Sequence, residues 1–179
     1  MMLLKKIINK ENSLQLSFLV VVPYLLINTG MFSDEYCISL TNQNKNLTDL
    51  LVPKGFFLIA PIENYTHFIW YHFIKIDNLK LVYILKILYV FLSLYFLVKF
   101  FTLFLNRQNA FLISLLFLFF PSHDSAPFIL LTQYITLTVS FYLYAFYLAY
   151  NNKMVWAFVV ATVASFTSYA SVVIAIPLF

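Results

Sequence analysis

From Ser13 to Phe32 the chain contains no charged residue, and most of the side chains in this stretch are apolar. A helix of about 20 apolar residues is long enough to cross the hydrocarbon core of a bilayer. Hydrophobic residues make up 63% of the whole chain and charged residues 10%, whereas soluble domains carry about 25% charged residues. The sequence therefore predicts an all-α, polytopic integral membrane protein.

Five apolar segments are expected to cross the membrane as helices. They cover residues 13–32, 81–105, 110–120, 128–150 and 155–179. The third segment is short, but polar residues before it and a proline after it make it a separate unit. The sequence stops inside the fifth apolar segment, so we expect the chain to be the truncated N-terminal portion of a longer protein.

Basic residues near the apolar segments indicate the orientation of the chain. Residues 1–12 carry three lysines, and cytoplasmic flanks of membrane helices have an excess of Lys and Arg. We therefore predict a cytoplasmic N-terminus, external loops at residues 33–80 and 121–127, and a location in a plasma, inner or endoplasmic reticulum membrane. Arg107 and Lys153 then lie inside, in agreement, while lysines in the first external loop count against this orientation. A signal peptide is the alternative for the first segment, but no small-residue cleavage site follows it.

The first external loop is too apolar and aromatic for a solvated linker. Residues 56–76 mix aromatic and polar side chains, which predicts an amphipathic helix that begins after Pro61 and lies in the membrane interface. An earlier short interfacial helix is expected over Asp34–Leu40. His67 and His72 are five residues apart, so a helix places them on different faces and they do not form a zinc site.

Acidic residues follow the first apolar segment and recur before the fourth. Asp34 and Glu35 are adjacent, and Asp124 lies in the predicted second external loop. Each site has an ordinary explanation, because acids stabilise the positive N-terminal end of a helix. However, the predicted orientation brings all three to the external face. A carboxylate there can deprotonate an attacking hydroxyl or hold a metal against a leaving phosphate.

Lysines inside the second apolar segment have two interpretations. Lys86 and Lys99 each lie about six residues from the nearer end, roughly 9 Å along a helix. Their ammonium groups can reach the membrane surface by snorkelling, which is the common outcome for such residues. The alternative is that Lys86, on the external side, contacts a lipid phosphate. The remaining lysines are scattered at the ends of apolar runs, so the net charge of +4 does not indicate a nucleic-acid partner.

The order of these parts resembles the GT-C superfamily of membrane glycosyltransferases, such as protein O-mannosyltransferases and aminoarabinose transferases. The acidic stretch Ser33–Tyr36 opens the long loop, and the aromatic helix that follows Ala60–Pro61 leads into the second span. The third span ends in Phe119–Pro121, and Asp124 takes the place of a second acid. The resemblance extends from the N-terminus to about Tyr150.

This resemblance implies transfer of a sugar from a polyprenyl-phosphate donor to an acceptor at the external membrane face. Asp34 or Glu35 would act as the base, and Asp124 would assist by holding a divalent metal or by orienting the acceptor. Lys86 and His123 would contact the donor phosphate. The alternatives are a flippase or transporter fragment and a non-enzymatic membrane subunit, and the sugar, acceptor, metal and oligomeric state stay open. Membrane lipids are expected partners in every case.

Overall fold

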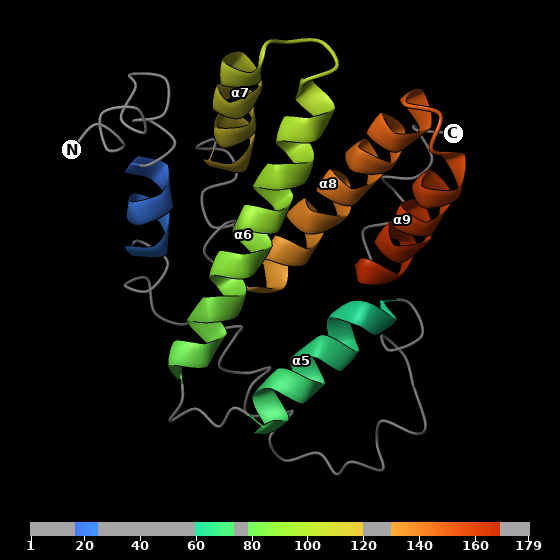
Figure 1. Ribbon diagram of the computed structural model, residues 1–179. Coiled ribbons are helices and arrows are strands. Elements are labelled where there is room, and N and C mark those ends of the chain that lie inside the picture. Colours follow the sequence, from blue (N-terminus) through green and yellow to red (C-terminus); the bar gives the residue numbers. More distant parts are fainter. Residues whose placement is uncertain (1–16, 25–59, 74–78, 120–129, 169–179) are drawn as a thin grey trace, which may run out of the picture. The chain divides into compact units, whose positions relative to one another are not determined.

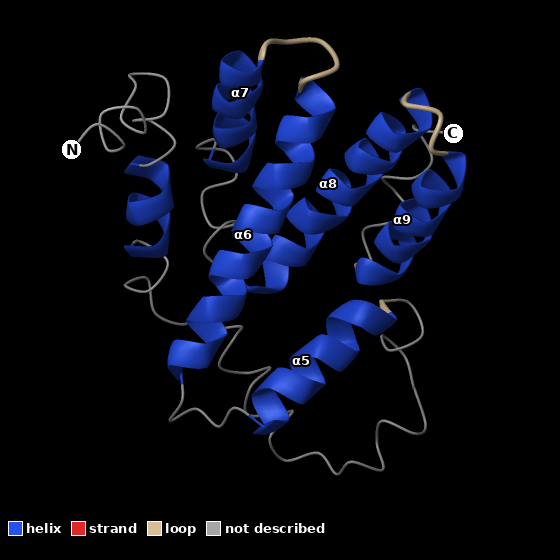
Figure 2. Cartoon of the chain, viewed as in Figure 1, coloured by secondary structure: helices blue, strands red, loops and turns tan. Residues whose placement is uncertain are grey.

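The computed structural model describes residues 17–24, 60–73, 79–119 and 130–168 of the chain. Contacts divide the chain into two units, Met1–Gly30 and Met31–Phe179. Within the described ranges the backbone consists of α-helices joined by turns, without a strand (Figure 2). The all-α prediction is therefore confirmed for this part of the chain.

In the first unit, residues 17–24 are helical. Most of their apolar side chains are exposed, with Leu19, Val20 and Val21 among them, and Val22 is the buried one. This helix lies inside the predicted first span, whose remaining residues are outside the described ranges.

Five helices make up the described part of the second unit (Figure 1). They are α5 (Pro61–Phe73), α6 (Leu79–Phe101), α7 (Arg107–Phe119), α8 (Leu130–Tyr150) and α9 (Met154–Thr167). The helix α5 begins at the position predicted for the amphipathic helix. The predicted short helix over residues 34–40 lies outside the described residues.

Local sequence explains where α5 and α7 begin. Proline at the first position of α5 has no N–H to leave unsatisfied, and its fixed φ suits a helix. The Ala60 carbonyl accepts hydrogen bonds from the backbone N–H and the side-chain amide of Asn64, at 3.1 and 2.8 Å. At α7, the Asn106 side-chain oxygen accepts a 2.9 Å hydrogen bond from the Asn109 N–H, which is an N-cap interaction.

The turn between α8 and α9 is a Schellman motif. Asn152 has φ 59°, in the left-handed region that asparagine tolerates better than most residues. The Lys153 N–H donates to the Leu148 carbonyl and the Asn152 N–H to the Ala149 carbonyl, both at 2.9 Å. These two bonds satisfy carbonyls that the end of α8 would otherwise leave unpaired. The turn reverses the chain within three residues, so α9 packs back along α8.

Aromatic pairs fix the relative direction of α6 and α8. The rings of Tyr89, midway along α6, and Tyr134, near the start of α8, are 5.1 Å apart, and those of Phe96 and Tyr144, further along each helix, are 4.6 Å apart. The two helices therefore run parallel. Because α7 packs on α6 and α9 on α8 after short turns, each of these pairs is antiparallel. The α6–α7 turn and the α8–α9 turn thus lie at one end, which we call the turn end; the starts of α6 and α8 form the opposite end.

Apolar length differs among the helices. In the described residues a single segment, Tyr83–Phe101 of α6, is long and apolar enough to cross a membrane, with a mean hydropathy of 2.0 over 19 residues. The helices α7 and α9 are apolar but short, at 13 and 14 residues. The helix α8 has 21 residues, but Gln133 and several Thr and Tyr lower its hydropathy. The polytopic arrangement accordingly stays a prediction.

The helices differ from the predicted spans at their ends. The helix α6 stops at Phe101, and residues 102–105 form turns that the prediction had included in the second span. Hydrogen bonds from Leu103 and Phe104 to carbonyls three residues back produce this change of direction. The helix α9 ends at Thr167, and Ser168 has an extended backbone; residues 169–179 lie outside the described ranges.

Candidate functional site

A row of polar residues lies on one face of the otherwise apolar helix α6. Lys86, Tyr89 and Ser93 are three and four residues apart, a spacing that places them on a single face. Lys86 is fully buried and Ser93 is 2% exposed, while Tyr89 is partly buried. This face is directed into the protein and not toward its surroundings.

The start of α8 supplies matching polar groups. The hydroxyls of Tyr134 and Tyr89 are 3.2 Å apart and share a hydrogen bond, and Tyr134 is buried. The Thr66 side chain of α5, which donates to the Ile62 carbonyl, also lies near the Tyr89 hydroxyl. Gln133 is 2% exposed beside Tyr134 in the sequence. These groups, with Lys86, form what we call the polar layer, which joins α5, the middle of α6 and the start of α8.

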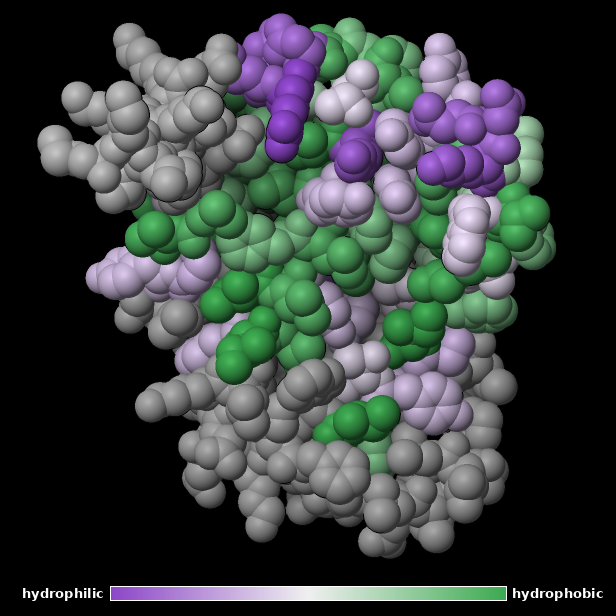
Figure 3. Space-filling model, viewed as in Figure 1, coloured by the Kyte–Doolittle hydropathy of each residue, from purple (hydrophilic) through white to green (hydrophobic). Residues whose placement is uncertain are grey.

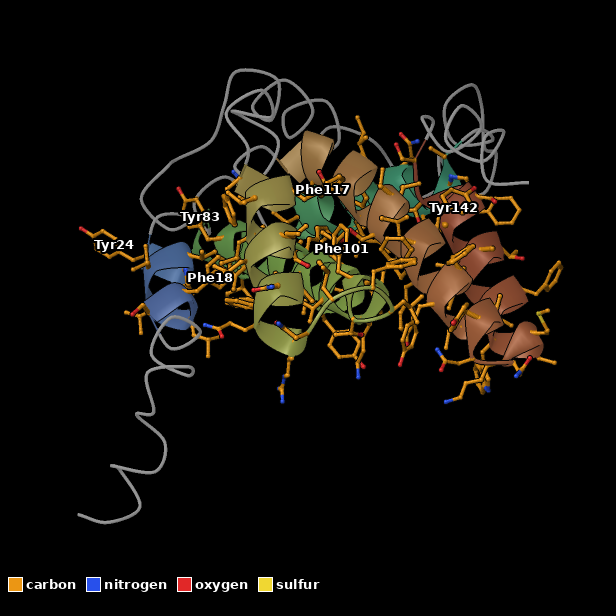
Figure 4. All side chains as sticks on the ribbon, turned by 90° about the horizontal axis from the view of Figure 1, so that it is seen from above. Phe18, Tyr24, Tyr83, Phe101, Phe117 and Tyr142 are labelled. Carbon is orange, nitrogen blue, oxygen red and sulfur yellow. The ribbon has the colours of Figure 1, made fainter. Side chains whose placement is uncertain are left out.

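Lys86 is the member with the most unusual environment. Its Nζ lies 5.9 Å from the ring centroid of Tyr83, one helical turn earlier, in cation–π range (Tyr83 is labelled in Figure 4). Full burial of the side chain means that the ammonium does not extend to the surface of the protein. Anchoring by snorkelling is therefore wrong for Lys86. Lys99, which is partly exposed beside the ring of Tyr95, retains that interpretation.

Of the predicted site residues, Lys86 lies in the described part of the chain. Asp34, Glu35, His123 and Asp124 lie outside the described residues, so their distances from Lys86 stay untested. The contact of Lys86 with a donor phosphate also stays a prediction.

The helix α7 ends at Phe119 and α8 begins at Leu130. Since α7 is antiparallel to α6 and α8 is parallel to it, the end of α7 and the start of α8 both lie away from the turn end. Residues 120–129 between them lie outside the described residues.

The turn end has a different character. Lys99, Arg107 and Lys153 belong to the last turn of α6, the start of α7 and the α8–α9 turn. Figure 3 shows hydrophilic residues gathered near the start of α7 and near the α8–α9 turn, with a mixture of hydrophilic and hydrophobic residues between. At the opposite end, Lys80 occupies the first turn of α6 and Lys86 is buried. Most of the basic residues of these helices thus gather at the turn end.

No cluster of three or more His, Cys, Asp or Glu side chains suited to a metal ion occurs in the described ranges. The side chains of His67 and His72 are not among those described. The divalent metal proposed beside Asp124 stays a prediction.

The polar layer contains residues that sequence reasoning did not select. Tyr89 and Tyr134 are 45 residues apart, and an aromatic-rich chain gives no reason to prefer these tyrosines. The spacing of Lys86, Tyr89 and Ser93 was a usable signal, because three polar side chains share one face of an apolar helix. The sequence did not identify Tyr134 as the partner of Tyr89, because that contact depends on how α6 and α8 pack together.

Comparisons with models of protein families, with curated proteins and with solved structures find no match to this chain. The resemblance to membrane glycosyltransferases, which was inferred from Ser33–Tyr36, Ala60–Lys75, Phe119–Pro121 and Asp124, stays a prediction from the sequence.

Proposed function

We propose that this chain is the membrane-embedded N-terminal part of a multi-pass glycosyltransferase with a cytoplasmic N-terminus. It would transfer a sugar from a polyprenyl-phosphate donor to an acceptor at the external membrane face. The observation that carries the proposal is a fully buried lysine, Lys86, in a polar layer between the helices.

Membrane placement is supported by the exposed surfaces of the helices. Large apolar side chains stand exposed on α6, α7 and α9, including Ile84, Leu88, Leu116 and Phe158. Removing a Leu or Phe side chain from water stabilises a protein by about 1.5–3 kcal/mol, so such surfaces favour a lipid environment. Further large apolar side chains are exposed along α6, α7 and α9, as expected for helices that face lipid.

Orientation is supported by the basic turn end. The positive-inside rule assigns short loops rich in Lys and Arg to the cytoplasm. The positions of Lys99, Arg107 and Lys153 therefore favour a cytoplasmic turn end, and the starts of α6 and α8 are then external. This agrees with the orientation derived from the lysines of residues 1–12.

The chemistry of the proposal divides roles among three groups. Asp34 or Glu35 takes the proton from the acceptor hydroxyl as it attacks the sugar carbon, and the bond from that carbon to the phosphate oxygen breaks. The donor phosphate leaves with its negative charge, which Lys86 and His123 would neutralise. Asp124 would hold a divalent metal on the phosphate or orient the acceptor. An ionisable residue inside a membrane segment is costly and is a functional candidate for that reason.

The same polar layer supports a second candidate. Transporters and flippases place polar groups between their helices to line a pathway for the substrate. Lys86 and Gln133 are buried polar residues of this kind. A flippase would move the lipid-linked sugar without transferring the sugar, and a non-enzymatic subunit would do neither.

Transfer of radiolabelled sugar from a synthetic polyprenyl-phosphate donor tests the proposal. It should be measured in membranes that contain the full-length protein. We expect Asp34→Asn with Glu35→Gln to abolish transfer, and Lys86→Met to reduce it, at unchanged protein levels. Lys99→Gln, which removes a lysine from the same helix outside the polar layer, should leave transfer intact. Full activity of the double carboxylate variant would refute the assigned base. Transbilayer movement of the donor without transfer would favour the flippase.

A further inference from the structure

A cavity of about 340 Å³ lies between α8 and α9 near the turn end, away from the polar layer. Small side chains leave this space open between the helices. They are Ala145 and Ala149 on α8 and Ala157 and Ala161 on α9, and the two alanines of each helix are one turn apart. The remaining lining residues are larger: Tyr142, Phe146, Met154 and Phe158.

The lining of this cavity is apolar. Tyr142 contributes the one polar atom of its side chains, and its hydroxyl already shares a 2.9 Å hydrogen bond with Ser165 (Tyr142 is labelled in Figure 4). Phe146 and Phe158 are exposed, at 47% and 75%, so the cavity opens as a groove on the surface. An apolar cavity of about 150 Å³ is enough to hold a benzene-sized molecule, and this one is about twice as large.

The lining of the groove suits a hydrocarbon chain. Alanines on both helices line it over one helical turn each, and a flexible hydrocarbon chain can lie along such an apolar surface.

A single charge stands beside the groove. Lys153 is exposed and directly precedes Met154, which lines the groove. From residue 143 to residue 168, Lys153 is the one charged residue. Tyr150 and Trp156 flank it, both exposed, and such amphipathic rings prefer the headgroup level of a membrane. The end of the groove therefore combines a cation with the aromatic residues typical of a membrane interface.

We propose that the α8–α9 groove binds one acyl chain of an anionic membrane phospholipid, with its phosphate at Lys153. This inference rests on the proposed membrane placement and is independent of the glycosyltransferase assignment. It adds a lipid site at the turn end, in the cytoplasmic leaflet of the proposed orientation. The polyprenyl-phosphate sugar donor of the proposed function is expected on the other side of the membrane, near Lys86.

Native mass spectrometry of the full chain tests the site. The protein is reconstituted in bilayers with equal amounts of phosphatidylglycerol and phosphatidylcholine that carry identical acyl chains, and is then released in mild detergent. We expect one retained phosphatidylglycerol per chain, in about fivefold preference over phosphatidylcholine, as one lysine at a membrane surface supplies. Lys153→Gln should bring the ratio close to one. Arg107→Gln, which removes a charge at the same end away from the groove, should leave the ratio unchanged.

A second pair of variants tests the groove itself. Ala161→Phe places a large side chain in the groove and should remove both retained lipids, while Val159→Phe, on an exposed side of the same helix, should not. Equal retention of the two lipids by the wild-type protein, or no effect of Lys153→Gln, would overturn the site. Lipid-free dimers that Ala161→Phe disrupts would overturn it too, since the groove would then join two copies.

Alkaline extraction of the membranes distinguishes failure of the proposed lipid site from failure of the proposed membrane placement. Release of the wild-type protein by alkali would refute the membrane placement and the lipid site together. Retention of the protein in the membrane without a preference for the anionic lipid would overturn the lipid site alone.

Discussion

The hydrogen bond between Tyr89 and Tyr134 should contribute measurably to the packing of α6 against α8. Phenylalanine at either position removes one hydroxyl and preserves the ring contact, whose centroids are 5.1 Å apart. Since Tyr89 also interacts with Thr66, single substitutions lose more than the bond of interest. A double-mutant cycle with Tyr89→Phe and Tyr134→Phe separates that bond from the other effects.

The expected coupling is small. The oxygen–oxygen distance of 3.2 Å is long for a hydroxyl pair, which favours the lower part of the usual range. Hydrogen bonds between membrane helices contribute about 0.6 kcal/mol on average and about 1.7 kcal/mol at most. We expect a coupling of about 0.6 kcal/mol, or about a threefold change in the unfolding equilibrium constant.

Reversible unfolding of the full chain in mixed micelles, followed by circular dichroism, measures the four free energies. Tyr89→Phe combined with Tyr150→Phe is the matched control, because Tyr150 is exposed at the far end of α8. These two changes should add within about 0.5 kcal/mol. A Tyr89–Tyr134 coupling of zero, or one equal to that of the control pair, would refute the reasoning.

Three further predictions concern other parts of the chain. Asn152→Ala should lower the free energy of unfolding by about 1 kcal/mol because alanine disfavours a φ of 59°, whereas Asn152→Gly should keep or raise it; equal effects in the same unfolding assay would contradict this. Ala110→Leu should cost about 1–3 kcal/mol, since Ala110 is fully buried on α7, while Leu at exposed Asn109 should cost much less; similar losses would contradict this packing. Cys37, the single cysteine, should react with a membrane-impermeant maleimide from outside intact cells; labelling only after permeabilisation would reverse the proposed orientation.

The helical part of the fold was predictable from local sequence. Polar residues and a proline around residues 110–120 predicted α7, and Asn106 then forms its N-cap. The predicted second span, by contrast, extended past the end of α6. Apart from Thr102, apolar side chains continue through Leu105, so hydropathy alone does not distinguish the last turn of a helix from the connection that follows.

The environment of Lys86 was not predictable in the same way. Its distance from the end of an apolar segment left two interpretations, anchoring at the interface or contact with a lipid phosphate, and neither predicts burial in the protein. Burial depends on which face of α6 packs inward, and α6 is apolar on nearly every side. The sequence of a helix without a clear polar face does not show which side packs inward, so contacts with neighbouring helices determine that side.

The sequence by itself determined the class of protein predicted here: long apolar segments, few charges and turn-forming asparagines dictate helices, because each of these signals acts within one or two turns of chain. Only the tertiary structure decided which helices run side by side, because pairing depends on the fit of side chains many residues apart. The parallel packing of α6 and α8 brings Tyr89 to Tyr134, and it places the α6–α7 turn with Arg107 and the α8–α9 turn with Lys153 at the same end. The alanines of α8 and α9 leave a groove only because the Asn152 turn brings those two helices together.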